Sequence, residues 1–215
     1  MSTTITVIGG TGYVGGHVVA EAASRGHAVT VVSRRAPAEP VAGVAYVQGA
    51  GDDAAVVAAA IADADAVVAA LSPRGDMAGR LVEVYRGIAD AATAAGKRLI
   101  VVGGFNGLRE SEGGPRFAES IPADWPYRAE ALEAVDVLDW LQSAAPAGLD
   151  WTFVSPAAVF GAYAPGERTG VYRVGGEVSI GGHESTLSGA DLGVAIVDAV
   201  ERGEHRGGAH VGVVN

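Results

Sequence analysis

A glycine-rich segment close to the N-terminus has the residue types and the spacing to bind a dinucleotide. Its residues are Gly9, Gly10, Thr11, Gly12, Tyr13, Val14 and Gly15. The glycines satisfy two spacings at once, G-x-G-x-x-G and G-x-x-G-x-x-G. Glycine at such positions permits a sharp turn, a close approach of a diphosphate to the backbone, and tight packing of a helix on a strand. Because a helix that starts here would offer free N–H groups to phosphate oxygens, we predict a cofactor site; the alternative is a turn with a structural role alone.

Two arginines after the next apolar run predict which dinucleotide binds. That run ends in Val32-Ser33-Arg34-Arg35. A site for NAD usually has Asp or Glu here, which accepts a hydrogen bond from the ribose 2′-hydroxyl. Arg34 and Arg35 would instead attract a 2′-phosphate, and a guanidinium can also stack on the adenine. We therefore predict NADP(H) in preference to NAD(H), with Arg34 as the first candidate; the alternative is a pair of solvated surface arginines.

Two further segments are expected beside the cofactor. Ala70, Leu71 and Ser72 follow an apolar run and would lie along the ribose and the nicotinamide. Asp52, with the preceding Gly51, could lie near the adenine. A carboxylate at that point could equally cap the helix that we expect over residues 52–62.

The elements that must position these residues alternate along the chain. Apolar runs typical of buried strands cover residues 5–8, 28–32, 43–47, 65–71, 98–102, 150–154 and 210–213. Helical spacing covers residues 13–24, 52–62, 78–95, 128–143 and 190–202. Strands that alternate with helices predict an α/β fold, a Rossmann-type doubly wound parallel sheet with helices on both faces. We expect residues 1–215 to form one such domain, with ligands at the carboxyl edge of the sheet.

Composition excludes several other classes of protein. The 215 residues carry a net charge of −10, spread along the chain, which disfavours nucleic acid and anionic lipid as partners. No uncharged apolar stretch approaches the ~18 residues of a membrane span, and no basic segment precedes the first apolar run as in a signal peptide. There is no cysteine, and the histidines lack metal-ligand spacing, so we expect no metal. We expect a cytoplasmic protein that acts on a small molecule.

Two long segments break the alternation and carry most of the candidate substrate residues. Residues 103–127 and 159–187 each follow a predicted strand, so they should form the substrate side of the sheet edge. Phe105, Trp125 and Phe160 could provide an apolar stacking pocket for a planar substrate, or they could pin the loops to the core. His183 is the one histidine that we retain as a candidate proton donor.

The chain resembles the atypical short-chain dehydrogenases/reductases along essentially its whole length. The resemblance rests on residues 9–15, 67–72, 101–104, 149–157, 168–173 and 187–192. Within that family the chain is most similar to the NADH-flavin reductase group, which is akin to the NmrA-like and biliverdin-reductase-B-like proteins. The resemblance implies that Gly103, Gly104 and Pro156 lie in turns that flank the nicotinamide. It also implies reduction of flavins, quinones or related conjugated acceptors.

One departure from the larger family concerns the proton donor. Most short-chain dehydrogenases use a Tyr-x-x-x-Lys pair, in which the lysine lowers the pKa of the tyrosine. Tyr127 stands in about the right region, but the residue four positions on is Ala131, and the single lysine is Lys97. Ordinary alcohol–ketone chemistry is therefore not expected. Tyr127 and Ser72 are the residues that we expect to hydrogen-bond a substrate.

Three functions fit these residues. The first is NADPH-dependent reduction of a flavin, a quinone or a similar conjugated small molecule, which needs two flat rings held face to face more than it needs an acid. The second is a non-catalytic NADP(H) sensor of the NmrA-like kind, which would bind a protein partner. The third is an NAD(P)-dependent epimerase or dehydratase, which the missing lysine disfavours. The sequence does not predict an oligomeric state.

Overall fold

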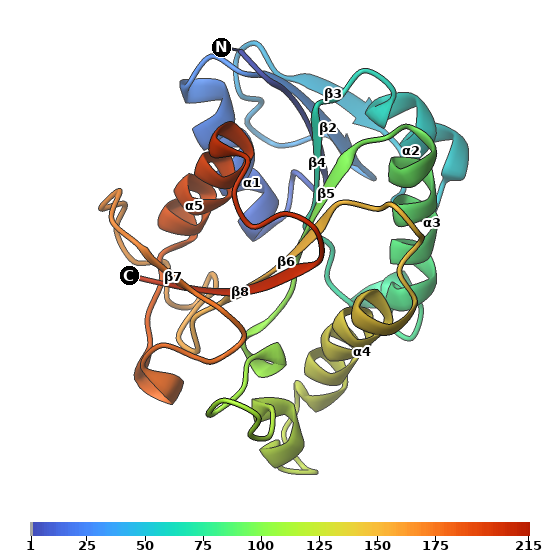
Figure 1. The fold of residues 1–215 in the computed structure, drawn as a ribbon. Helices are drawn as coiled ribbons and strands as arrows, with labels where there is room; N and C mark the ends of the chain where they lie inside the picture. Colours follow the sequence, from blue (N-terminus) through green and yellow to red (C-terminus); the bar gives the residue numbers. More distant parts are fainter. Residues whose placement is uncertain (1) are drawn as a thin grey trace.

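The computed structural model describes residues 2–215, in which strands and helices alternate (Figure 1). The strands are β1 (Thr4–Ile8), β2 (Ala28–Ser33), β3 (Ala45–Gln48), β4 (Ala66–Ala69), β5 (Arg98–Val102), β6 (Trp151–Pro156), β7 (Arg173–Gly175) and β8 (Ala209–Val214). The helices are α1 (Tyr13–Ser24), α2 (Ala54–Ile61), α3 (Leu81–Ala94), α4 (Arg128–Ala144) and α5 (Gly189–Arg202). Four 3-10 turns lie in the loops: η1 (Gly75–Met77), η2 (Phe105–Gly107), η3 (Phe117–Ser120) and η4 (Gly182–Glu184).

The strands form one sheet in the order β3-β2-β1-β4-β5-β6-β8-β7. Every neighbouring pair is parallel except β7 with β8, which is antiparallel. The chain winds outward from β1 through β2 to β3 and then returns to β4 on the other side of β1. The direction of winding therefore reverses between β1 and β4, and loops diverge there at the carboxyl edge. This confirms the predicted Rossmann-type α/β fold.

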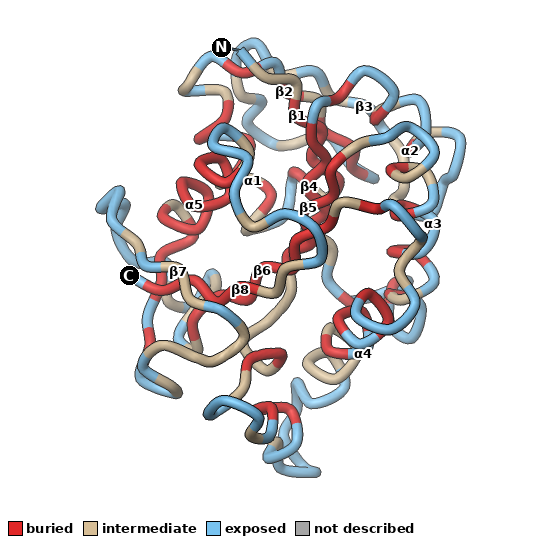
Figure 2. The backbone as a smooth tube through the Cα atoms, in the orientation of Figure 1, coloured by how far each residue is buried: buried red, intermediate tan, exposed pale blue. Residues whose placement is uncertain are grey.

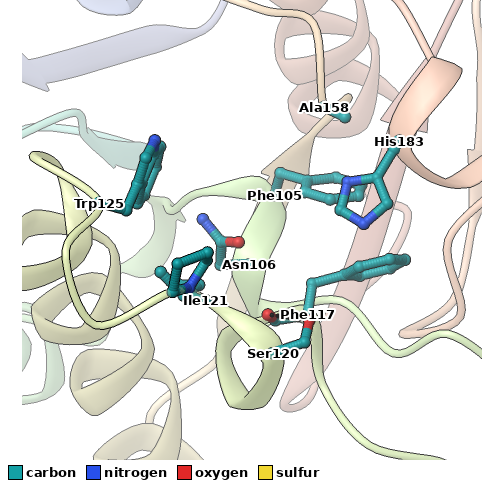
Figure 3. Close-up of a pocket in the computed structure, with 9 residues that line it drawn as sticks. Phe105, Asn106, Phe117, Ser120, Ile121, Trp125, Ala158 and His183 are labelled. Carbon is teal, nitrogen blue, oxygen red and sulfur yellow. Dashed lines mark hydrogen bonds between the residues drawn. The ribbon is translucent and has the colours of Figure 1, made fainter.

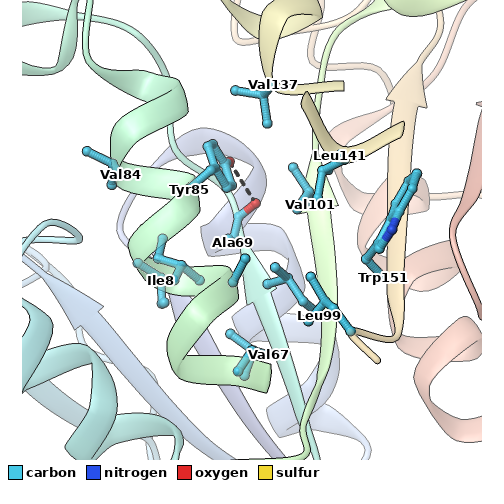
Figure 4. Packing of buried hydrophobic residues seen from close by; sticks show 14 of the residues in the cluster. Ile8, Val67, Ala69, Val84, Tyr85, Leu99, Val101, Val137, Leu141 and Trp151 are labelled. Atoms are coloured by element: carbon cyan, nitrogen blue, oxygen red, sulfur yellow. Dashed lines mark hydrogen bonds between the residues drawn. The ribbon is translucent and has the colours of Figure 1, made fainter. Parts of the chain in front are cut away.

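Alternating residues of the central strands supply two apolar layers, one on each face of the sheet. One layer packs against α2, α3 and α4 and includes Ile8, Val67, Leu99 and Val101 (Figure 4). The other packs against α1 and α5 and includes Val7 and Ile100. Figure 2 shows buried residues along the central strands and on the helices that cover them. Parallel strands covered on both faces bury nearly every side chain, which is why these runs are apolar throughout.

Most predicted elements are present with shifted ends, but the strand β7 was not predicted. It lies inside residues 159–187, which we expected to be a loop, and it pairs through Val174 with Val213 of β8. Its three residues are exposed or half-buried. So short an edge strand has no apolar run and no alternation for a sequence to reveal.

Within residues 2–215, no helix is long and apolar enough to cross a membrane.

The helices α2 and α3 are capped by acidic side chains that fix the loops before them. Asp53, not Asp52, caps α2 and accepts from the backbone N–H groups of Ala55 and Val56. Asp52 instead forms an ion pair with Arg80, with 3.2 Å between Oδ2 and Nη2, so the expected cap at Asp52 was wrong by one residue. Glu133 of α4 reaches across to α3 and accepts from the N–H of Leu81 at 2.7 Å.

A buried carboxylate attaches the loop of residues 159–187 to α5. Asp191 is fully buried and accepts hydrogen bonds from the backbone N–H groups of Thr169 and Gly170, at 3.0 and 2.7 Å. The Thr169 hydroxyl and the Asn215 carboxamide donate to the same carboxylate. The neighbouring Arg168 pairs with Glu21 of α1 at 3.0 Å. The Arg168-Thr169-Gly170 motif thus anchors this loop.

The loop anchor makes stability depend on pH. Burial alone would raise the pKa of Asp191, but the hydrogen bonds from Gly170, Thr169 and Asn215 together outweigh it and hold the pKa below its ordinary value of 3.8. A carboxylate with a depressed pKa in the folded state contributes stability above its unfolded pKa, and this contribution is lost as the pH falls further.

Replacing Asp191 with Asn should lower the free energy of unfolding at pH 7 by about 1–3 kcal/mol, because buried donors lose an ionised acceptor. The difference in unfolding free energy between the variant and the wild type should shrink as the pH falls below 3.8, the ordinary pKa of an aspartate carboxyl group. Urea denaturation at neutral and acidic pH measures both effects. Asp90→Asn, at an exposed position of α3, is the control and should match the wild type. An unfolding deficit in Asp191→Asn that is the same at every pH would contradict the explanation.

Candidate functional site

Two glycines of the turn between β1 and α1 allow contacts that no other residue could make. Gly9 has a φ of +84°, and a Cβ built there would lie 2.5 Å from the carbonyl oxygen of Ala70. A Cβ on Gly15 would lie 2.3 Å from the carbonyl oxygen of Gly9. The first contact presses the turn against the end of β4, and the second presses α1 against the turn. Both distances are far below van der Waals contact, so these positions require glycine.

The third glycine of the motif leaves the start of α1 open. Gly12 is the N-cap residue of α1 and offers no capping side chain, and the first turn carries no acidic residue. A Cβ on Gly12 would meet only the carbonyl oxygen of Gly9 within 4 Å, at 3.2 Å. By contrast, α2 and α5 are capped by Asp53 and Ser188.

The N–H groups in the first turn of α1 are therefore available to a ligand. The helical ladder begins with the N–H of Gly16, which donates to the carbonyl of Gly12 at 2.8 Å. The N–H groups of Tyr13, Val14 and Gly15 precede that bond and have no carbonyl one turn back within the helix. Free N–H groups and the positive end of the helix dipole favour phosphate oxygens. This glycine cradle, which larger side chains would fill, fits the diphosphate of a dinucleotide.

The arginines after β2 lie next to this cradle. The N–H of Gly9 donates to the carbonyl of Val32 at 2.9 Å, which joins the glycine turn to the end of β2. The Ser33 hydroxyl donates to the carbonyl of Arg35 at 2.8 Å and holds the backbone of the bend. Arg34 and Arg35 are both exposed. Nη1 of Arg34 lies 3.7 Å from Oδ2 of Asp76, a carboxylate in η1 that is 96 % exposed.

The predicted cofactor segment after β4 is fixed by a tyrosine that the sequence analysis missed. Ala70 donates its N–H to the carbonyl of Ile8 at 2.9 Å. The hydroxyl of Tyr85, on α3, accepts from the N–H of Leu71 at 3.3 Å and donates to the carbonyl of Ala69 at 3.2 Å (Figure 4). Burial raises the pKa of Tyr85, so the phenol stays neutral and holds the strand end in place. Ser72, which follows, is exposed.

Packing at the end of β5 requires a glycine at position 103. A Cβ on Gly103 would lie 2.0 Å from the ring of Phe153, so the ring occupies the space that a side chain would need. Gly104 has open space around it. The N–H of Gly103 donates to the carbonyl of Val154 at 2.9 Å, and Val154 lies two residues before Pro156 in β6. The segments that the family resemblance assigns to the nicotinamide are therefore adjacent.

A cavity of about 510 Å³ opens beside these two strand ends (Figure 3). Its lining consists mainly of apolar and aromatic side chains: Phe105, Asn106, Phe117, Ser120, Ile121, Pro122, Trp125, Ala158 and His183. Phe105 and Phe117 lie with their ring centroids 4.4 Å apart, and His183 meets Phe117 edge-on at 4.8 Å. In Figure 3, Trp125 and Ile121 face these rings from the opposite side, with Asn106 between. This geometry suits a flat apolar molecule.

The structure brings some of the predicted substrate residues together and separates others. Phe105 and Trp125 both line the cavity. Phe160 packs instead against Tyr13, with 5.6 Å between the ring centroids. The ring centroids of Tyr127 and Trp125 lie 5.6 Å apart. Tyr127 is 53 % exposed and does not line the cavity. The roles assigned to these residues stay predictions.

Several lining residues were not predicted individually. Asn106, Phe117, Ser120, Ile121 and Pro122 all belong to residues 103–127, the segment that we expected on the substrate side. Nothing in their spacing distinguishes them, because the 3-10 turns η2 and η3 that carry them have no long periodicity.

A half-buried histidine of β8 lies against β6. Nε2 of His210 lies 2.9 Å from the hydroxyl oxygen of Ser155. Burial, with a smaller contribution from Arg116, lowers the pKa of His210 to about 4. The ring is therefore neutral near pH 7.

Within residues 2–215, no group of acidic or histidine side chains could hold a metal ion.

The chain is similar to known proteins over most of its length. Residues 9–202 match the family described as NAD(P)H-binding. The YwnB protein of Bacillus subtilis, which carries no functional name, is 33% identical over 213 residues, 94% of each chain. A "putative NADH-flavin reductase" of Streptococcus pneumoniae is 26% identical over 100% of both chains, with a TM-score of 0.84. A "putative epimerase" of Bacteroides thetaiotaomicron is 27% identical over 100% of this chain and 97% of its own, with a TM-score of 0.85.

Replacing Gly12 with Ala should weaken dinucleotide binding by roughly tenfold or more, a loss of about 1.4 kcal/mol or more, because a methyl group would occupy the cradle. Titration followed by nicotinamide fluorescence measures the Kd, and thermal unfolding measures stability. Gly15→Ala is the matched variant, and its unfolding temperature should fall well below that of Gly12→Ala because its Cβ would overlap the Gly9 carbonyl. Wild-type affinity in a folded Gly12→Ala variant would contradict the site.

Proposed function

Because the chain belongs to the NAD(P)H-binding family, we propose that it is an oxidoreductase that uses NADPH to reduce a flavin, a quinone or a related conjugated small molecule. The observation that carries this proposal is the aromatic cavity beside the ends of β5 and β6, at the same sheet edge as the glycine turn. A dinucleotide laid along that edge would bring its nicotinamide toward the cavity.

The chain's own residues would hold the cofactor at three points. The N–H groups in the first turn of α1 would bind the diphosphate, with Gly12 leaving room for it. Arg34, with Arg35 beside it, would pair with the 2′-phosphate. Leu71 and Ser72 would lie along the ribose and nicotinamide, on the backbone that Tyr85 fixes.

Positioning of the acceptor would be the main catalytic contribution of the chain. Bound NADPH would supply a hydride. Phe105, Phe117 and Trp125 would hold a flat acceptor and exclude water, and face-to-face placement at near-attack distance accounts for a large share of such a reaction. Tyr127, on the rim next to Trp125, and Ser72 are proposed to hydrogen-bond the acceptor.

The absence of the usual acid supports a conjugated acceptor over a simple ketone or an epimerase substrate. Lys97 is the single lysine and directly precedes β5, so it lies at the amino edge of the sheet, opposite the cavity. No lysine can therefore stand beside Tyr127. A ketone needs its developing alkoxide protonated or stabilised, whereas a flavin or quinone spreads the charge over a ring system. The name of the Bacteroides protein suggests an epimerase, but that chemistry would need such an acid.

Purified protein should oxidise NADPH when mixed with a panel of flavins and quinones, and loss of the reduced-nicotinamide absorbance measures the rate. Turnover that follows Michaelis–Menten behaviour with at least one acceptor supports the enzyme. Saturable NADPH binding without turnover on a wide panel would overturn it in favour of a non-catalytic NADP(H) sensor.

Replacing Arg34 with Ala should weaken NADPH binding by roughly 10- to 100-fold and leave NADH binding nearly unchanged. The reason is the loss of charge-assisted hydrogen bonds to the 2′-phosphate, worth about 1.5–3 kcal/mol. Kd values for both dinucleotides, measured by calorimetry, test this. Arg35→Ala is the matched control and should have the smaller effect on the NADPH/NADH ratio. An unaltered ratio in Arg34→Ala would show that Arg34 does not select the cofactor.

Asp76 should oppose NADPH binding, because its carboxylate lies 3.7 Å from the Arg34 guanidinium. The 2′-phosphate would have to displace this carboxylate to pair with Arg34. Asp76→Asn is therefore expected to strengthen NADPH binding severalfold at low ionic strength, with little change at high salt. NADH affinity should stay the same. The matched control is Glu83→Gln, another exposed acidic side chain of the same region. Equal gains for NADPH and NADH would rule out competition for Arg34.

A further inference from the structure

His183 is the one titratable side chain among the nine residues that line the aromatic cavity. The others are aliphatic, aromatic, amide or hydroxyl side chains. We infer that His183 is a catalytic residue that gives a proton to a carbonyl oxygen of the acceptor, and that the cavity takes a neutral flat quinone. This inference rests on the proposed function and adds the acid and the acceptor class to it.

The backbone around His183 is held in a fixed position relative to the cavity. His183 lies in η4, between Gly182, which has a φ of +55°, and Glu184. The hydroxyl of the buried Ser185 donates to the carbonyl of Gly182 at 2.6 Å and accepts from the N–H of Ala158 at 3.0 Å. Ala158 itself lines the cavity. One side chain therefore ties the histidine's turn to the loop after β6.

The imidazole ring of His183 is held by aromatic contacts and keeps its nitrogens free. Its centroid lies 4.8 Å from the Phe117 ring and 5.5 Å from the Phe105 ring (Figure 3). Across residues 2–215, no side chain or backbone group hydrogen-bonds either ring nitrogen, whereas His27 pairs with Glu201 and His210 with Ser155. A rigidly placed imidazole with unused donors is suited to act on a bound molecule.

The charged groups near His183 are few and are engaged elsewhere. Glu184, its neighbour in η4, is exposed. In the η3 segment that packs against His183, the Glu119 carboxylate accepts from the backbone N–H of Arg116 at 2.8 Å. The Arg116 guanidinium pairs with Asp139 and Gln142 of α4. No carboxylate or guanidinium reaches the lining, so His183 is the single proton source there.

The lining also limits the acceptor. Without a cationic side chain besides His183, the cavity offers no partner for the phosphate of a flavin nucleotide. A neutral quinone needs only apolar walls and hydrogen bonds at its two oxygens. Asn106, whose carboxamide points into the cavity in Figure 3, can donate to one oxygen while His183 serves the other.

In the proposed step, bound NADPH would supply the quinone with a hydrogen and its electron pair and would become NADP⁺. The resulting hydroquinone monoanion takes a proton from the His183 imidazolium, the N–H bond breaks as the O–H bond forms, and neutral hydroquinone is released. Because His183 is exposed, solvent would return the proton.

His183→Ala tests this with steady-state kinetics on NADPH and a simple naphthoquinone. We expect kcat to fall by roughly 100-fold, as for loss of a general acid, with the Kd for NADPH unchanged. Added imidazole should restore part of the lost rate, and the solvent deuterium isotope effect of the wild type should differ in the variant. Glu184→Gln, one residue away and outside the lining, should keep wild-type kinetics. Naphthoquinone should also be a better acceptor than flavin mononucleotide.

Each other outcome overturns a specific part of the account. If His183→Ala turns over naphthoquinone at the wild-type rate, or if imidazole gives no rescue of a reduced rate, His183 is not the acid and the reductase assignment stands alone. If flavin mononucleotide is the better acceptor, the quinone assignment is wrong. If the wild type binds NADPH but reduces no acceptor, the inference and the proposed function both fail.

Discussion

The fold depends on close backbone contacts of the glycine turn with the end of β4 and with α1. These contacts lie where the sheet reverses its direction of winding. Gly9 lies against the carbonyl of Ala70 at the end of β4, and Gly15 brings α1 against the carbonyl of Gly9. A Cβ at Gly9 would push the turn away from β4, and a Cβ at Gly15 would push α1 away from the turn. The same close packing points the free N–H groups of α1 out of the sheet edge. The packing of the central strands therefore also shapes the turn that we propose to bind the diphosphate.

The rest of the site is assembled on this edge by hydrogen bonds from outside the sheet. Tyr85 and Glu133 fix the two ends of the segment between β4 and α3. Asp191 and Ser185 fix the loop that follows β6, which brings His183 to the aromatic rings of residues 103–127. Each anchor is buried or part-buried, so the loops that carry the candidate chemistry are attached to the core at defined points.

Sequence patterns predicted the layers of the fold and the glycine turn because these depend on local rules. Buried parallel strands are apolar throughout, and the spacing of Gly9, Gly12 and Gly15 has a direct steric cause. Three features were not predicted because they depend on contacts between distant segments or on a one-residue difference. They are the short strand β7, the pairing of Arg168 with Glu21, and the cap at Asp53. The cavity lining was predicted as a segment, but Phe117 and Asn106 were not singled out, since only tertiary packing selects them.

The proposed function depends on binding of a phosphorylated dinucleotide by the first turn of α1 and the arginine bend after β2. Calorimetric titration of the intact chain with NADPH and with NADH tests it most directly. We expect saturable binding of one dinucleotide per chain, with a lower Kd for NADPH than for NADH. The difference in Kd should diminish as salt screens the 2′-phosphate. Absence of saturation with both dinucleotides would contradict the site itself, and equal affinities would contradict the role of the arginines.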